Sequence, residues 1–184
     1  VLAGEVSGLE VCRVVDDTQK AGGARLEIGV GAHDRELFQM INGISPTVES
    51  LSKVVQVVAQ HRQGSAEKHP LNRLGAERLL REILIAKPGL VGAQHLNRAE
   101  PPVARLNLKD AIPCVAMGEA SGRNLVVVCS AIIDTDLVPF AADARLCLDP
   151  NAELVLAVAP NNVLPSMTRL AEALRARAKF VVVD

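Results

Sequence analysis

The sequence predicts an α/β protein. We expect a mixed sheet with an antiparallel hairpin and a C-terminal parallel β-α-β unit, and helices packed on it. Two apolar runs at 113–132 flank Ser121 and Gly122, which is typical of an antiparallel hairpin. Residues 154–159, LVLAVA, form a continuous apolar run that indicates a strand buried on both faces. A helical pattern and another apolar run at 180–183 follow, an order typical of two parallel strands joined by a crossover helix.

The first third of the chain predicts a smaller hairpin followed by two helices. Residues 9–15 and 25–30 are apolar or alternating, and the polar, glycine-rich segment between them indicates a loop. A short helix is expected after this hairpin. Pro46 suits the first position of the next helix with Ser45 as its N-cap, and apolar residues recur at helical spacing over 48–58.

Weaker patterns predict the remaining elements. Residues 72–86 repeat leucine and isoleucine at helical spacing, whereas 92–102 are predicted to be irregular. We expect a weak strand at 103–108, one or two short helical turns over 134–148, and a helix over 165–179.

The segment 63–70, QGSAEKHP, is polar and is the best candidate for a linker. We therefore divide the chain into an N-terminal hairpin with two helices over 1–63 and a C-terminal α/β core over 71–184. The two parts are expected to pack as one compact unit, since 184 residues suffice for a single domain.

The composition excludes some function classes. The 20 basic and 21 acidic side chains give a net charge of −1, whereas a nucleic-acid binder usually carries a basic excess. Aromatic residues make up 2% of the chain, so it has almost none of the aromatic faces on which single strands or sugars stack, and these functions are disfavoured. Nucleic acid is therefore an unlikely partner.

The four cysteines form no C-x-x-C pair, which argues against structural zinc and a disulfide framework. We infer a reducing, cytoplasmic setting. No apolar run reaches the length of a membrane span, so a membrane partner is not expected. The sequence begins at Val1 rather than at Met, which leaves room for a preceding N-terminal segment.

The first candidate site follows the strand at 125–130. Ser130, Asp134 and Asp136 come just after this strand, and ligands of open α/β sheets collect at the carboxyl ends of strands. The aspartates could hold Mg²⁺ or Mn²⁺, and the serine could act on a bound phosphate. The competing interpretation is that an aspartate caps the following helix, and no G-x-S-x-G elbow surrounds Ser130.

The second candidate is the segment 29–36, GVGAHDRE. Gly29 and Gly31 follow a strand and precede a helix, as phosphate-binding loops do, and His33 could serve as a general base. The full G-x-G-x-x-G pattern is absent because Asp34 occupies the last glycine position. A tight turn with Asp34 as a helix cap is the simpler interpretation.

Acidic residues form the third candidate set. Glu10 and Glu27 lie on the two strands of the first hairpin and could share a metal if the register brings them together, with Glu5 and Asp34 nearby in sequence. The predicted order of elements over 72–159 is also compatible with nucleases of the PD-(D/E)xK type. Those enzymes need a Glu-x-Lys on a strand, and neither LEIG nor VVVCS supplies one.

The fourth candidate is cationic. The last predicted helix ends in basic residues, which suit the negative end of a helix dipole. A phosphate-binding patch would need basic residues of the helix over 72–86, such as Arg73, Arg78 and Arg81, on the same face. The cationic residues of the last helix are Arg169, Arg175, Arg177 and Lys179.

The phrases GVGAHDRE, HPLNRL and VVVCSAIIDTDLVPFAADARL resemble a family of actinobacterial proteins that carries no assigned activity. The resemblance runs over most of the chain. It implies a bacterial cytoplasmic protein and indicates no reaction, so no functional residue is transferred from it.

Two hypotheses of function remain. The first is a site for a phosphate-bearing or anionic ligand, bound or hydrolysed with the help of a metal at Asp134 and Asp136. The second is a non-catalytic interaction module with a degenerate nuclease-like fold. Its valine-rich strands could extend a sheet into a homo-oligomer or bind a partner.

Overall fold

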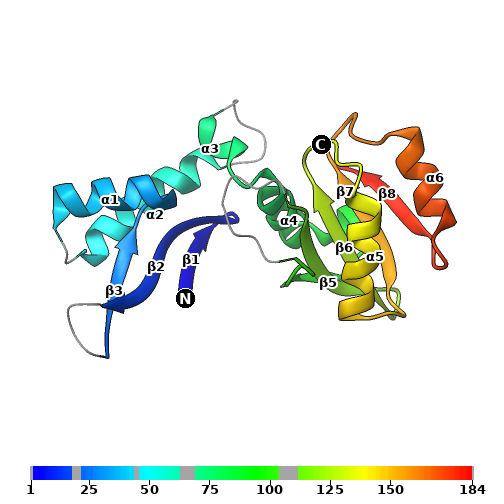
Figure 1. The fold of residues 1–184 in the computed structure, drawn as a ribbon, viewed down its shortest axis with the longest axis horizontal. Coiled ribbons are helices and arrows are strands. Elements are labelled where there is room, and N and C mark those ends of the chain that lie inside the picture. Colours follow the sequence, from blue (N-terminus) through cyan, green and yellow to red (C-terminus); the bar gives the residue numbers. More distant parts are fainter. Residues whose placement is uncertain (1, 18–21, 44–45, 63–68, 104–111, 184) are drawn as a thin grey trace. The chain divides into compact units, whose positions relative to one another are not determined.

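The computed structural model describes residues 2–17, 22–43, 46–62, 69–103 and 112–183 (Figure 1). The chain divides into two compact units, Val1–Leu74 and Gly75–Asp184. The predicted linker at 63–70 lies largely outside the described residues. Each unit has its own sheet and its own apolar core.

The N-terminal unit is a three-stranded antiparallel sheet in the order β1-β2-β3 (Figure 1). The predicted hairpin is confirmed as β2 and β3. Strand β1 is an additional edge strand that the sequence did not predict, because its first two residues are exposed and its third is a glycine. The elements are β1 (Leu2–Val6), β2 (Leu9–Asp17), β3 (Gly23–Ile28), α1 (Gly31–Asn42), α2 (Val48–His61) and α3 (Pro70–Arg73).

The start of α2 differs from the prediction. Thr47 is the N-cap: its hydroxyl accepts from the Ser50 backbone N–H at 3.1 Å, and the Ser50 hydroxyl accepts from the Thr47 N–H at 3.0 Å. This reciprocal pair satisfies two backbone donors and makes Thr47 the N-cap, so the helix starts at Val48, two residues past Pro46. Pro46 is thus not the first helical residue, and Ser45 lies outside the described residues.

The C-terminal unit holds a five-stranded sheet in the order β4-β5-β6-β7-β8 (Figure 1). The first three strands are antiparallel, and β7 and β8 continue the sheet in parallel, so the predicted mixed α/β class is confirmed. The elements are α4 (Ala76–Ala86), the 3₁₀ turn η1 (Pro88–Val91), β4 (His95–Ala99), β5 (Cys114–Ala120), β6 (Arg123–Ser130), α5 (Leu137–Leu148), β7 (Glu153–Val158), α6 (Pro165–Ala173) and β8 (Ala178–Val182).

Three predictions in this unit were wrong. The region expected to be irregular contains β4, a polar edge strand without apolar alternation. Helix α5 runs for 12 residues, because Pro139 falls in its first turn, where no backbone N–H is needed. Helix α6 ends at Ala173, since Leu174 is extended (ψ 141°). Of the expected strand at 103–108, residues 104–108 lie outside the described part of the chain.

The core of this unit forms on both faces of β6, whose residues 125–130 are at most 1% exposed. One face packs against α4 and the other against α5 and α6. The side chains of β6 are therefore shielded from solvent along the strand, and polar groups can meet a ligand only near the two ends of the central strands. We call these the carboxyl edge, after β6 and β7 end, and the amino edge, where β6, β7 and β8 begin.

No helix within the described ranges combines the length and apolar character that a membrane crossing requires.

Candidate functional site

Ser130 lies at the carboxyl edge, at the last position of β6, and is 1% exposed. Its hydroxyl donates a hydrogen bond to the Ile132 carbonyl at 3.0 Å. The side chain thus supports the backbone turn that leaves the strand. A nucleophile needs a base to accept its proton, whereas this hydroxyl is directed at a carbonyl oxygen.

Asp134 and Asp136 lie on the loop between Ser130 and α5. One carboxylate oxygen of Asp134 accepts from the Asp136 backbone N–H at 2.9 Å, a local turn that prepares the start of the helix. Asp136 is the N-cap residue of α5, but its side chain makes no capping hydrogen bond. In the described part of the chain, no three His, Cys, Asp or Glu side chains gather closely enough to hold a metal.

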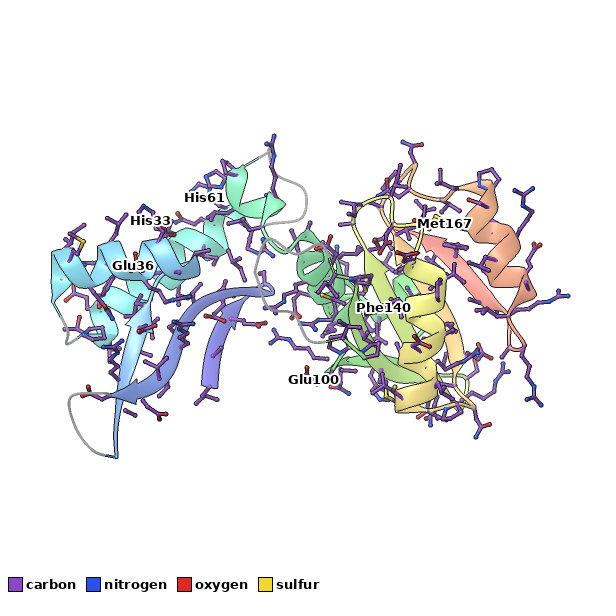
Figure 2. All side chains as sticks on the ribbon, in the orientation of Figure 1. His33, Glu36, His61, Glu100, Phe140 and Met167 are labelled. Atoms are coloured by element: carbon purple, nitrogen blue, oxygen red, sulfur yellow. The ribbon has the colours of Figure 1, made fainter. Side chains whose placement is uncertain are left out.

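Gly29 and Gly31 adopt backbone conformations that residues with side chains rarely adopt. Gly29 has φ 138°, and a Cβ there would lie 2.8 Å from the backbone nitrogen of Arg35. Gly31 has φ 83°, again in the region that favours glycine. The two glycines let β3 turn into α1 at close range. His33 lies beyond them on the exposed side of α1, near Glu36 (Figure 2).

Glu10 and Glu27 of the first hairpin form ion pairs with arginines. Arg35 is buried and contacts Glu10 at 3.0 Å and Glu27 at 3.7 Å. Arg13 and Arg25 each reach Glu27 at 2.8 Å. These contacts favour a structural ion-pair network, because a metal shared by Glu10 and Glu27 would have to displace Arg35.

Glu27 is the centre of this network. Its burial alone would raise the pKa of the carboxyl, but the hydrogen bonds from Arg13 and Arg25 outweigh that effect and hold the pKa below its ordinary value. The carboxyl is therefore ionised at neutral pH and accepts from both guanidinium groups.

Strand β6 is the third strand of the meander β4-β5-β6, and it carries no Glu-x-Lys. Here Val127 and Cys129 face α4 and are 0% exposed. Burial strongly raises the pKa of the Cys129 thiol. The register places Cys114 directly opposite Cys129. These positions form apolar core, which disfavours charged catalytic groups.

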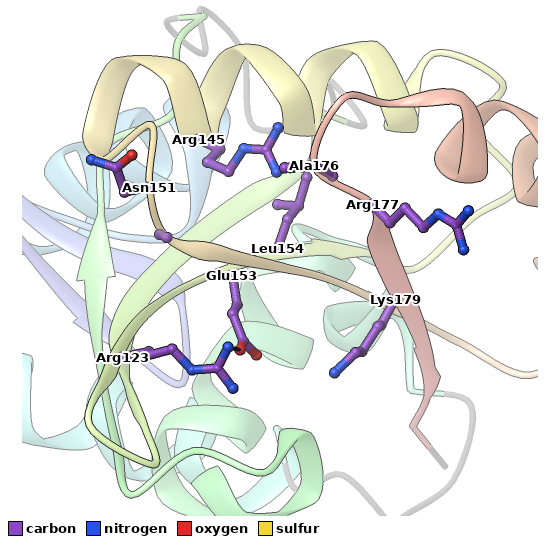
Figure 3. A pocket seen from close by; sticks show the side chains of 9 residues that line it. Arg123, Arg145, Asn151, Glu153, Leu154, Ala176, Arg177 and Lys179 are labelled. Carbon is purple, nitrogen blue, oxygen red and sulfur yellow. Dashed lines mark hydrogen bonds and ion pairs between the residues drawn. The ribbon is translucent and has the colours of Figure 1, made fainter.

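Basic side chains meet instead at the amino edge. A hollow of about 280 Å³ opens there, between the starts of β7 and β8 and the end of α5 (Figure 3). We call it the amino-edge pocket. Four of its side chains are cationic, and Glu153 is the only carboxylate among the described residues that line it. Its lining residues are Arg123, Arg145, Asn151, Ala152, Glu153, Leu154, Ala176, Arg177 and Lys179.

Two of the four cations are held in place by the protein. Arg123 forms an ion pair with Glu153 at 2.5 Å, and Arg145 donates to the Ala176 carbonyl at 2.9 Å. Arg177 and Lys179 are exposed and pair with no carboxylate among the described residues. The arrangement leaves an excess of positive charge in a concave site, which attracts anions.

The wall of the pocket next to Asn151 is a fixed turn. The Asp149 carboxylate accepts from the Asn124 side chain at 2.6 Å and from the Asn151 backbone at 2.9 Å. These hydrogen bonds, first the one from Asn124, hold the pKa of Asp149 below its ordinary value. The carboxylate of Asp149 is thus already engaged with neutral donors.

Sequence reasoning found two of the four cations, Arg177 and Lys179, but assigned them to the end of a helix. The structure removes that explanation: α6 ends at Ala173, and Lys179 lies on β8. Their neighbours Arg123 and Arg145 are distant in sequence and form no motif. Lys179 directly precedes the apolar run FVVV, and this is the only signal in the sequence that could have assigned Lys179 to a strand and not to the helix.

No protein-family model matches the chain, and comparisons with curated proteins and with solved structures gave no match either. The function has to be argued from the site itself.

Proposed function

We propose that the C-terminal unit binds a small phosphate-bearing or otherwise anionic ligand in the amino-edge pocket. The observation that carries this proposal is the gathering of Arg123, Arg145, Arg177 and Lys179 around one hollow that holds a single carboxylate. Guanidinium and ammonium groups are the usual protein donors to phosphate oxygens.

The contacts of Ser130 and Asp134 at the carboxyl edge favour ligand binding over hydrolysis. The Ser130 hydroxyl and one Asp134 oxygen are engaged with backbone groups of their own loop. The nuclease-like order of elements in this unit supports no reaction, since Val127 and Cys129 are core residues. We therefore propose a binding module built on a nuclease-like arrangement of elements.

Replacing Arg145 or Lys179 with glutamine is expected to weaken binding of inorganic phosphate about threefold to tenfold, because each change removes one charge-assisted contact. Isothermal titration calorimetry of the full chain measures this. Arg169→Gln is the matched control, since Arg169 is exposed on α6 outside the pocket. Equal affinity in all four proteins, or no binding to wild type, would refute the proposal.

Partner binding by the N-terminal unit is a second candidate, supported by an apolar stripe on α1. Leu37, Met40 and Ile41 are spaced along one face of the helix, and the last two are 82% and 80% exposed. Asp34 and Glu36 are exposed beside them, whereas the only arginine of α1 is buried. We propose that the stripe takes a partner segment that is apolar and basic, because α1 of a second copy would bring no exposed lysine or arginine.

A labelled amphipathic peptide with leucines on one face and lysines on the other is a suitable probe. Met40→Ser is expected to weaken its binding about threefold to tenfold in fluorescence anisotropy, through lost apolar contact. Leu170→Ser, which alters an exposed leucine of α6, should leave binding unchanged. If light scattering shows that the wild type self-associates and Met40→Ser abolishes this, the stripe binds a second copy and the proposed chemistry is wrong.

A further inference from the structure

The amino-edge pocket contains basic residues from both faces of the sheet. Side chains alternate between faces along a strand, and Val155 packs on the α4 face. Glu153 lies two residues before Val155, and Lys179 on β8 is the register partner of Val155. Both therefore belong to the α4 face, as does Arg123, which pairs with Glu153.

Arg145 approaches from the opposite face. It is on α5, next to Ala144, which packs with Leu154 on the other side of the sheet. Figure 3 shows Arg145 and Ala176 on one side of the β7 ribbon and Arg123, Glu153 and Lys179 on the other. The basic residues thus form two groups, separated by the amino edge of β7.

The start of β7 separates the two groups of basic residues. Ala152 and Leu154 line the pocket there and are themselves 4% and 2% exposed. Arg177 lies on the segment between α6 and β8. It directly follows Ala176, whose carbonyl accepts the hydrogen bond from Arg145. A single phosphate would contact the cations of either group but only one group at a time, whereas a ligand reaching around the edge would contact both groups at once.

We infer that the ligand of this pocket carries two linked anionic groups, one bound by Arg145 and Arg177 and the other by Lys179 and Arg123. This inference rests on the proposed function and narrows it to small molecules with a diphosphate or an equivalent pair of anions. A nucleic-acid backbone offers the same chemistry. The small ligand is favoured because the unit has no aromatic platform at this edge: no Phe, Tyr or Trp lines the pocket.

Calorimetric titration of the full chain with phosphate and with pyrophosphate tests the inference. We expect pyrophosphate to bind at least about tenfold more tightly, because it can contact cations of both groups. Arg145→Gln and Lys179→Gln should each reduce pyrophosphate affinity by more than about tenfold, against about threefold to tenfold for phosphate, since either variant leaves only one complete group of cations. Arg169→Gln is the control, and equal unfolding midpoints confirm that the variants are folded.

The outcomes separate the inference from the proposed function. Tight phosphate binding without preference for pyrophosphate, or a pyrophosphate affinity that only one of the two variants lowers, would overturn the inference and leave anion binding standing. Failure of both anions to bind would overturn both. A single-stranded oligonucleotide that binds more tightly than pyrophosphate, with steep salt dependence, would overturn the small-molecule assignment in favour of nucleic acid. If Arg145→Gln does not fold, a double variant is used in its place. This variant combines Arg145→Lys, which keeps the charge, with Arg177→Gln.

Discussion

A Cys129→Lys substitution is expected to lower the free energy of unfolding of the C-terminal unit by more than about 4 kcal/mol, enough to prevent folding in a protein of ordinary stability. Cys129 is 0% exposed and lies in the apolar cluster on the α4 face of the sheet. A lysine there would have to be buried either charged or deprotonated, and both are costly. The raised pKa of the Cys129 thiol has the same cause, the penalty on charge at a buried site.

Chemical denaturation followed by far-ultraviolet circular dichroism measures this effect. Cys147→Lys provides the matched control, because Cys147 is exposed on α5 and should tolerate the change within about 0.5 kcal/mol. If Cys129→Lys folds with wild-type stability, then water or a cavity reaches β6. In that case the α4 face of β6 would be accessible to solvent, and the apolar core assigned to it would be wrong.

The second large effect is expected in the N-terminal unit, where Arg62→Met should cost about 3–5 kcal/mol of unfolding free energy. Arg62 is 2% exposed and donates to the carbonyls of Ser7, Leu71 and Leu74 at 2.9, 2.6 and 2.8 Å. Methionine fills similar volume but leaves these carbonyls without the guanidinium donors, and each unsatisfied buried acceptor costs about 1–3 kcal/mol.

The same denaturation measurement applies, with Lys53→Met as the control, since Lys53 is largely exposed and its ion pair with Glu49 is a surface pair. An unfolding curve for Arg62→Met that overlays the wild type would mean that the three carbonyls find other donors. The role assigned to Arg62 in joining the β1–β2 turn to α3 would then be wrong.

The mixed sheet could be predicted because its central strands are buried on both faces. The valines of β6 and the run in β7 leave no face for solvent, so the pattern was unambiguous. Edge strands are different. Strand β4 pairs on one side only and carries His95, Asn97 and Arg98, so its sequence shows no apolar alternation.

The candidate site was harder to predict because it depends on tertiary contacts. That the Ser130 hydroxyl would turn back to the Ile132 carbonyl is decided by the path of the loop, which the side-chain types do not reveal. The amino-edge pocket combines residues from β6, α5 and β8. A sequence pattern cannot bring Arg123 and Lys179 together before the strand order is known.

The location of anion binding tests the proposed function most directly. Amide proton–nitrogen correlation spectra of the full chain can be recorded during titration with phosphate alone and, separately, with Mg²⁺ alone. We predict that phosphate shifts the amide signals around Asn151, Ala152 and 176–179 and leaves those of 130–136 in place. Phosphate or Mg²⁺ shifts centred on 130–136, with none at the amino edge, would contradict the proposal and restore Asp134 and Asp136 as the site.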